Sequence, residues 1–214
     1  MNKQDERQQV IDYALKLNTT GLSPGKSGNI SVRFNEGLLV TPSGVEYQQL
    51  SPSDIVNMDL SGNVSDDCVL QPSSEWHFHS DLYQSRADIN AIVHTHSTYC
   101  TALACTGRSI PAFHYMVAIA GGKDIPIAPY ALFGTEQLSE NIVACLQSRQ
   151  ACLLANHGMI AMGSDLATAF KLAQEVEALA KQYCIALKLG NLNVLSDQEM
   201  IEVLDRFKHY GQRL

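Results

Sequence analysis

Two histidines separated by one threonine, His94 and His96, form the most informative short pattern in the sequence. They end a segment, residues 90–96, that predicts a buried strand. Alternate residues of a strand point to the same face of a sheet. Two neutral imidazoles on one face can therefore bind the same metal ion with little rearrangement. The spacing alone leaves open the alternative that both are ordinary hydrogen-bonded core histidines.

A third metal ligand must come from elsewhere in the chain, and His157 is the best candidate. It lies between Asn156 and Gly158 in an otherwise apolar stretch, residues 150–162, that predicts two strands joined by a tight turn. A histidine at such a turn can present its ring to a cavity. Three histidines with one open coordination position are typical of a catalytic metal site, whereas structural zinc sites are closed.

A second pair with the same spacing, His77 and His79, falls in a segment that predicts a helix over residues 73–85. Residues two apart on a helix diverge by roughly 200°, so we do not expect these two rings to share an ion. The same segment carries Glu75, a carboxylate that could move a proton beside a metal ion. The alternative is a first-turn glutamate that favours the helix dipole.

Three short segments could hold a phosphate group. Each combines glycine, hydroxyl or amide residues at a turn or at a predicted helix start, where backbone N–H groups can face an anion. The segments are Gly28-Asn29, Ser43-Gly44 and Ser73-Ser74. Each alone is also compatible with an ordinary turn or helix cap. Because the sequence contains no Walker-type or Rossmann-type glycine motif, it gives no support for nucleotide chemistry.

The elements that would position these residues predict a single α/β domain over residues 1–214. Apolar periodicity predicts a first helix that ends near Gly21, a long helix capped by Ser164 and a last helix opened by Ser196. We expect a mostly antiparallel central sheet flanked by helices on both faces. The predicted strands cover residues 30–34, 38–41, 55–59, 90–96 and the two halves of 150–162.

Composition indicates an ordinary folded protein, with 45% hydrophobic residues and a net charge of -7. No cluster of lysine and arginine occurs, so nucleic acid is not an expected partner. The six cysteines form no C-x-x-C pair, which favours buried free thiols in a reducing compartment. We see no signal-peptide pattern, and no apolar run approaches the roughly 20 residues of a membrane helix. We therefore expect a cytoplasmic protein with no membrane partner.

Seven strings that occur in order along the chain resemble the class II aldolase and adducin-head family. They are Gly28–Arg33, Val40–Gly44, Pro72–Trp76, Val93–His96, Ile110–Met116, Ala128–Thr135 and Asn156–Gly158. The resemblance extends from the first helix to Tyr210-Gly211. Ser43 departs from the threonine of similar members, and Asn156 departs from the histidine of some. These departures bear on substrate detail and leave the three histidines intact.

The resemblance implies a cofactor, a set of site residues and an assembly. The metal is Zn²⁺, one per subunit, bound by His94, His96 and His157. Glu75 is the acid/base residue and can also occupy the open coordination position. The residues that the resemblance assigns to phosphate are Gly28, Asn29, Ser43, Gly44, Ser73 and Ser74.

The remaining implied residues concern the aldehyde. Tyr115 reaches the active site of a neighbouring subunit and protonates the aldehyde oxygen, while Phe133 and Tyr210 shape the aldehyde pocket. The implied assembly is a homotetramer with fourfold cyclic symmetry and active sites between subunits. The expected partner is a small sugar phosphate.

The implied reaction is the reversible cleavage of a ketose 1-phosphate through a metal-stabilised enediolate. We expect L-fuculose 1-phosphate to give dihydroxyacetone phosphate and L-lactaldehyde. The alternatives within the family are 4-epimerisation of L-ribulose 5-phosphate and dehydration of a phosphosugar. The epimerase carries an acidic residue after the region of Tyr115, whereas residues 116–119 are apolar here. A non-enzymatic scaffold resembling the adducin head is a further alternative, against which retention of the three histidines and Glu75 argues.

Overall fold

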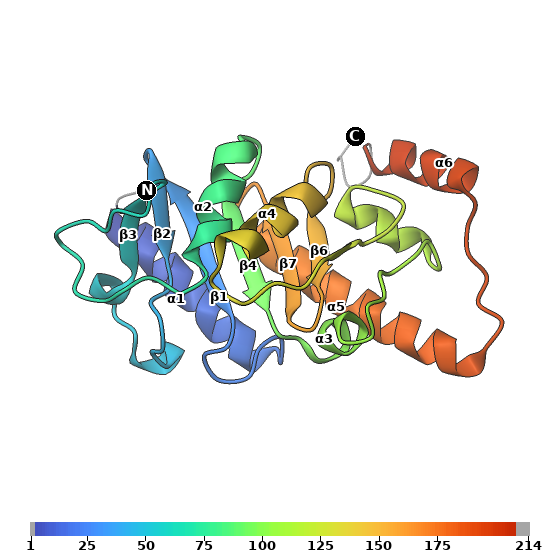
Figure 1. Cartoon of the computed structure of the whole chain (residues 1–214), viewed down its shortest axis with the longest axis horizontal. Coiled ribbons are helices and arrows are strands. Elements are labelled where there is room, and N and C mark those ends of the chain that lie inside the picture. Colours follow the sequence, from blue (N-terminus) through green and yellow to red (C-terminus); the bar gives the residue numbers. More distant parts are fainter. Residues whose placement is uncertain (1–2, 209–214) are drawn as a thin grey trace.

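The computed structural model describes residues 3–208, which form a seven-stranded sheet with the strand order β3-β2-β1-β4-β7-β6-β5 (Figure 1). All neighbouring strands are antiparallel except β5 and β6, so the sheet is mixed, with its parallel pair at one edge. This agrees with the expectation of a mostly antiparallel sheet. The strands are β1 (Asn29–Phe34), β2 (Gly37–Val40), β3 (Val56–Asp59), β4 (Ala91–Thr95), β5 (Ile127–Ala128), β6 (Ala151–Leu154) and β7 (Gly158–Gly163).

The parallel pair has a simple origin in chain connectivity. Helix α4 (Glu136–Cys145) lies between β5 and β6 in the sequence. A connection of this length can return the chain to the end of the sheet at which β5 begins. Strand β6 therefore runs in the same direction as β5. The sequence patterns did not predict β5 or α4. Thr135 begins α4 by accepting a hydrogen bond from the Leu138 backbone N–H at 3.3 Å.

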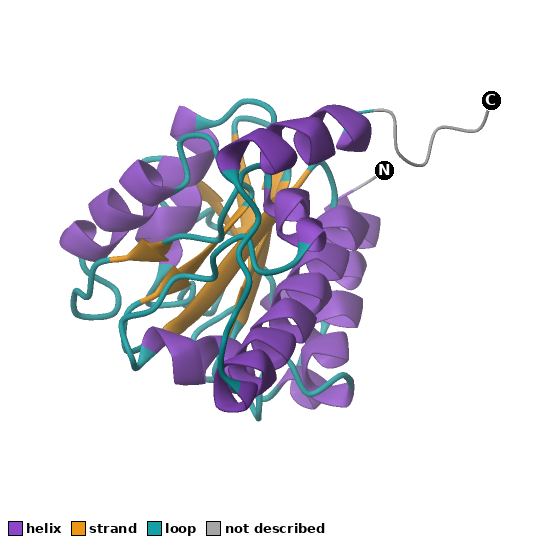
Figure 2. Cartoon of the chain, turned by 90° about the vertical axis from the view of Figure 1, so that its right-hand side faces the viewer, coloured by secondary structure: helices purple, strands orange, loops and turns teal. Residues whose placement is uncertain are grey.

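Helices cover both faces of the sheet (Figure 2). The apolar residues of α1 (Lys3–Thr19), α3 (Thr98–Ala104) and α5 (Leu166–Leu189) share one core with Ala91 and Val93 of β4. Those of α2 (Trp76–Ser85) and α4 share a second core with Ile92. Because strand residues alternate between faces, His94 lies on the α2 face of the sheet. The 3₁₀ helix η3 (Tyr115–Ala120) packs on α6 (Asp197–Phe207) through a third, small cluster of apolar residues.

Two helix starts differ from the sequence expectation. Asp165, and not Ser164, caps α5 by accepting a hydrogen bond from the Thr168 N–H at 2.7 Å. Aspartate and serine are both good N-caps, so adjacent residues of this kind leave the choice to the tertiary fold. Glu75 occupies the N-cap position of α2, and the two serines before it lie outside the helix. The capping box of Ser196 and Glu199 at α6 is confirmed.

The six cysteines are all free thiols, but they are not all buried. Cys100 and Cys152 are buried, Cys105 is exposed, and the other three are intermediate. Among residues 3–208, no helix combines the length and the apolar character that crossing a bilayer would require.

Candidate metal centre

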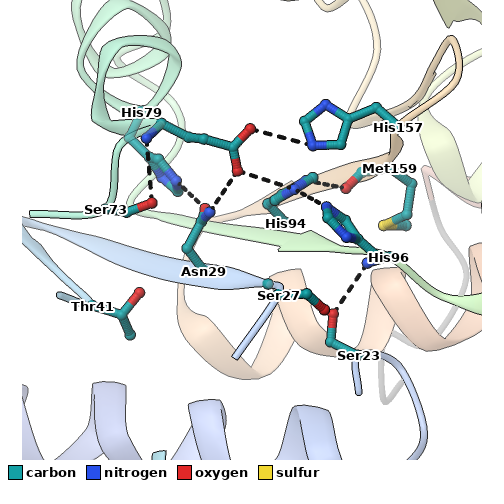
Figure 3. Close-up of polar contacts among 12 residues, drawn as sticks. Ser23, Ser27, Asn29, Thr41, Ser73, His79, His94, His96, His157 and Met159 are labelled. Carbon is teal, nitrogen blue, oxygen red and sulfur yellow. Dashed lines mark hydrogen bonds and ion pairs between the residues drawn. The ribbon is translucent and has the colours of Figure 1, made fainter. Parts of the chain in front are cut away.

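Three imidazole rings converge where the central strand β4 ends, on the face of the sheet that α2 covers (Figure 3). His94 lies on the central strand β4, directly opposite Asn29 of β1 on one side and Ile160 of β7 on the other. His96 follows β4, and its backbone N–H donates to the Ser23 hydroxyl at 3.1 Å. The predicted pair of histidines is therefore placed by the strand itself and by the loop that follows it.

His157 reaches the same point from the hairpin between β6 and β7. Residues 155–157 form a three-residue loop, because Leu154 pairs with Gly158 across the two strands. Asn156 in this loop has a φ of 55°, a left-handed conformation that asparagine tolerates better than most residues. At Gly158 an added Cβ would lie 2.3 Å from the Thr95 carbonyl oxygen, so only glycine fits beside β4.

Three distances among the donor atoms are close to the edge of a coordination tetrahedron, and one ligand nitrogen from each histidine lies within 4.8 Å of the other two. Two ligands that each lie 2.0–2.1 Å from one zinc ion are about 3.3 Å apart. The Nε2 atoms of His94 and His96 are 3.0 Å apart, and those of His94 and His157 lie 3.3 Å from the two Glu75 carboxylate oxygens. The ring centroids of the three histidines form a nearly equilateral triangle with sides of 4.8–4.9 Å.

The protonation of the rings suits metal binding. Burial lowers the pKa of His94 to about 3 and that of His157 to about 4, and burial also lowers the pKa of His96. All three rings are therefore neutral near pH 7. His94 Nδ1 contacts the Met159 carbonyl oxygen at 2.9 Å and must donate to it, because a carbonyl only accepts. The lone pair of His94 Nε2 consequently faces the cluster, as it does in metal-bound histidines.

Glu75 completes a donor set that a divalent cation fits. Its side chain is 8% exposed, and its Oε1 atom is buried without a hydrogen-bond partner. Its Oε2 atom faces the His94 Nε2 lone pair at 3.3 Å, so two acceptors confront each other. Such an arrangement of a buried carboxylate and neutral nitrogens is unfavourable unless a positive charge lies between them. Three nitrogens and one carboxylate are a donor set that zinc and other divalent ions accept.

The three candidate phosphate segments lie side by side next to this cluster. The Ser73 N–H donates to the Thr41 carbonyl at 3.0 Å, and the Ser43 N–H donates to the Gln71 carbonyl at 3.1 Å. The Thr41 N–H in turn donates to the Ile30 carbonyl of β1 at 3.0 Å. The structure therefore brings together segments that are up to 45 residues apart in sequence, from Asn29 to Ser74.

Two residues of these segments have backbones that require glycine. Gly44 has a φ of 73°, and at Gly28 an added Cβ would lie 2.7 Å from the His94 carbonyl oxygen. The Lys26 ammonium donates to the Gly44 carbonyl at 2.8 Å, so a positive charge lies beside two of the segments. Nothing in the local sequence around Lys26 indicates that it bridges to a turn 18 residues away.

A cavity of about 320 Å³ opens onto the cluster. Its lining residues are Ser27, Ser74, Glu75, His96, Tyr130, Ala131, Phe133, Asn156 and His157. Phe133 thus lines the cavity next to the three histidines. Sequence reasoning missed Ser27 and Tyr130 as lining residues, although both fall beside or within the strings that carried the family resemblance.

Of the two remaining candidate residues, only Tyr115 is described, and it is not brought to the cavity within one chain. Tyr115 is 50% exposed, stacks on the His114 ring and does not line the cavity. Tyr210 lies outside the described residues. The excluded pair on α2 diverges, as helix geometry predicts: the His77 ring stacks on Trp76, whereas His79 points toward β1.

Comparison with known proteins gives consistent results. The family of class II aldolase and adducin N-terminal domains matches residues 8–184. A 5-methylthioribulose-1-phosphate/5-deoxyribulose-1-phosphate aldolase of Rhodospirillum rubrum is 51% identical, with 96% of this chain and 92% of the relative covered. An L-fuculose phosphate aldolase of Escherichia coli K12 is 47% identical, with 100% and 99% covered. A solved structure of an L-fuculose 1-phosphate aldolase superposes with a TM-score of 0.92 at 44% identity, covering 97% of this chain and 98% of that one.

Proposed function

The chain belongs to the class II aldolase and adducin family as an aldolase-type lyase, and from this premise we propose that it cleaves a ketose 1-phosphate into dihydroxyacetone phosphate and an aldehyde. One observation carries the proposal. One ligand nitrogen from each of His94, His96 and His157 lies within 4.8 Å of the other two, and the Glu75 carboxylate faces them at the wall of a cavity of about 320 Å³.

We propose Zn²⁺, one per subunit, as the ion that His94, His96 and His157 bind. A divalent cation acts there as a Lewis acid that polarises the ketone and offsets the negative charge that develops on cleavage. Glu75 takes up and returns the proton at the carbon that attacks the aldehyde in the synthetic direction. Its Oε1 atom is suited to this task, because it has no hydrogen-bond partner among the described residues.

The substrate that we propose first is L-fuculose 1-phosphate, which would release L-lactaldehyde. The relative from Rhodospirillum rubrum supports a second candidate, 5-methylthioribulose 1-phosphate or 5-deoxyribulose 1-phosphate. All three compounds share the 1-phosphate and the ketone and end in a methyl or methylthio group. Phe133, Tyr130 and Ala131 give the cavity an apolar wall that suits such an end.

Product analysis tests the proposed reaction. Purified protein is incubated with each of these ketose 1-phosphates and with L-ribulose 5-phosphate, and the products are followed by NMR. We expect cleavage of a 1-phosphate, loss of activity with a chelator and recovery with a divalent ion. Borohydride in the presence of substrate should not trap the enzyme. Epimerisation, loss of water or a borohydride-trapped lysine adduct would each contradict the proposal.

We propose that Gly28, Asn29, Ser43, Gly44, Ser73 and Ser74 hold the substrate phosphate, with Lys26 adding a positive charge. Ser74→Ala is expected to raise KM about 10-fold with little change in kcat, as for the loss of one hydrogen bond to a charged group. Ser74 is exposed and lines the cavity, so its replacement should leave the fold intact. Steady-state kinetics with the preferred ketose phosphate provide the measurement.

Ser148→Ala is a matched control for Ser74→Ala. Ser148 is also exposed, but it lies before β6, at the end of that strand opposite His157. An unchanged KM in Ser74→Ala, or an equal rise in both variants, would remove Ser74 from the phosphate site.

We propose that the protein is a cytoplasmic homotetramer in which Tyr115 donates a proton to the aldehyde oxygen in a neighbouring subunit. The position of Tyr115 supports this, because its side chain is half exposed and lies away from the cavity of its own chain. Co-expression of Tyr115→Phe and Glu75→Gln subunits should then create mixed sites that carry both native residues. At random assembly about a quarter of the sites would be of this kind.

The measurement is kcat for the mixed population against each variant alone. We expect the mixture to exceed the sum of the two separate variants and to approach a quarter of the wild-type value. A mixture that is no more active than that sum would place Tyr115 outside a shared site.

A further inference from the structure

A continuous network of hydrogen-bonded, buried side chains runs behind Glu75, and Figure 3 shows its part at Asn29 and His79. The Asn29 amide nitrogen contacts Glu75 Oε2 at 2.9 Å, and Asn29 Oδ1 contacts His79 Nε2 at 2.6 Å. His79 Nδ1 contacts the Ser31 hydroxyl at 2.7 Å, which contacts the Tyr83 hydroxyl at 2.9 Å. Taken as whole residues, all five are at most 6% exposed, and His79 is completely buried.

This network of hydrogen-bonded side chains follows from a match between helix and strand spacing. Glu75, His79 and Tyr83 are four residues apart and form one stripe at α2 and its N-cap. Asn29 and Ser31 are two residues apart and point to the same face of β1. Four helix residues advance roughly 6 Å and two strand residues roughly 6.6 Å, so the two rows interleave. The histidine that does not suit a shared metal ion is thereby held directly behind the proposed proton-transfer residue.

The direction of every hydrogen bond in this network, from Glu75 to Tyr83, can be assigned. The Asn29 NH₂ group faces Glu75 Oε2 and donates to it, so the amide oxygen, which only accepts, faces His79. His79 Nε2 therefore carries the ring proton and donates. Burial lowers the pKa of His79 well below its usual value, so Nδ1 is an acceptor, to which Ser31 donates. Burial raises the pKa of Tyr83, which keeps its proton and donates to Ser31.

We propose that His79 is a positioning residue for the reaction: it locks the Asn29 amide so that its NH₂ group holds Glu75 Oε2 and leaves Oε1 to carry the proton. The proposal rests on the proposed role of Glu75 and extends it to a residue that touches neither substrate nor metal. If Asn29 turned its amide over, its oxygen would face the carboxylate and repel it. The His79 Nε2 donor opposes that turn as well, because the turned amide would place its NH₂ group against an N–H group.

Two substitutions of His79 separate this role from a purely structural one. The amide nitrogen of glutamine reaches about as far as Nε2, so His79→Gln keeps the donor to Asn29. Asparagine is one methylene shorter, so His79→Asn keeps a group only near the Nδ1 position. Both variants replace the ring by the same amide, and both are measured only after folding and metal content have been checked.

The readouts are kcat, KM and the exchange of deuterium from D₂O into dihydroxyacetone phosphate without any aldehyde. The exchange reaction isolates the proton step assigned to Glu75. His79→Asn is expected to lower kcat and the exchange rate about 10- to 100-fold, with KM changed less than about threefold. His79→Gln should stay within about threefold of wild type in all three quantities. His77→Asn and His77→Gln are the controls on the same helix and should behave as wild type.

Equal losses in both His79 variants, or no loss in either, would overturn the proposal. Should His79→Asn fail to fold, neutron diffraction from wild-type crystals still decides, since we expect a deuteron on Nε2 of His79 and none on Nδ1. A deuteron on Nδ1 would overturn the proposal in that case. Failure of the proposed function is distinct, because it would appear as wild-type protein without aldolase activity.

Discussion

Replacing Glu75 with glutamine is expected to lower kcat by about 10²- to 10⁴-fold, the range for loss of a general acid–base group. Glutamine has nearly the same shape but cannot take up the substrate proton. The three histidines remain, so the variant should keep a stoichiometric divalent ion. The expected result is thus an enzyme that folds and binds metal but does not exchange or transfer the proton.

The measurement for this variant combines steady-state kinetics, metal analysis and deuterium exchange into dihydroxyacetone phosphate. Glu36→Gln is a suitable control, because Glu36 is exposed in the turn between β1 and β2. It should be indistinguishable from wild type. Full activity in Glu75→Gln would remove Glu75 from the proton step. Loss of metal together with activity would instead make it chiefly a ligand.

The second large effect is expected for His157→Ala, which should lose the metal ion and reduce activity about a thousandfold or more, as expected when several kcal/mol of Lewis-acid stabilisation are lost. Of the three rings, His157 is the best to remove, because it lies in a hairpin loop and is 12% exposed. His94 is fully buried and contacts Phe78 edge-on with ring centroids 5.7 Å apart, so its removal would also disturb the core.

Metal content of the purified variant, measured before and after dialysis against the divalent ion, tests this expectation. His114→Ala is the control, since the His114 ring accepts a hydrogen bond from the Met116 N–H and belongs to a different part of the fold. It should keep the ion. A His157→Ala variant that binds one ion with unchanged affinity would show that the third ring is not a ligand.

The sequence allowed prediction of the parts of the site that depend on local geometry. The alternation of a strand predicted that His94 and His96 share one face, and the structure places their Nε2 atoms 3.0 Å apart. The glycine after His157 indicated a tight turn, and the helical period separated His77 from His79. Each of these inferences needs only the periodicity of one element. The mostly antiparallel sheet with helices on both faces followed in the same way from successive apolar patterns.

The parts that could not be predicted depend on contacts between distant segments. Nothing near His79 indicates that Asn29, 50 residues earlier, will face its ring. The bridge from Lys26 to Gly44 and the role of Tyr130 in the cavity wall are set by the same kind of tertiary packing. The short strand β5 has only two residues, too few to give a pattern. The role proposed for Tyr115 depends on a second subunit.

Anomalous X-ray scattering from crystals of the purified protein tests the central claim most directly. We predict one strong peak per subunit at the zinc absorption edge, about 2.0–2.1 Å from the Nε2 atoms of His94, His96 and His157. A crystal in which these three rings turn away from one another, with no anomalous scatterer between them, would contradict the account.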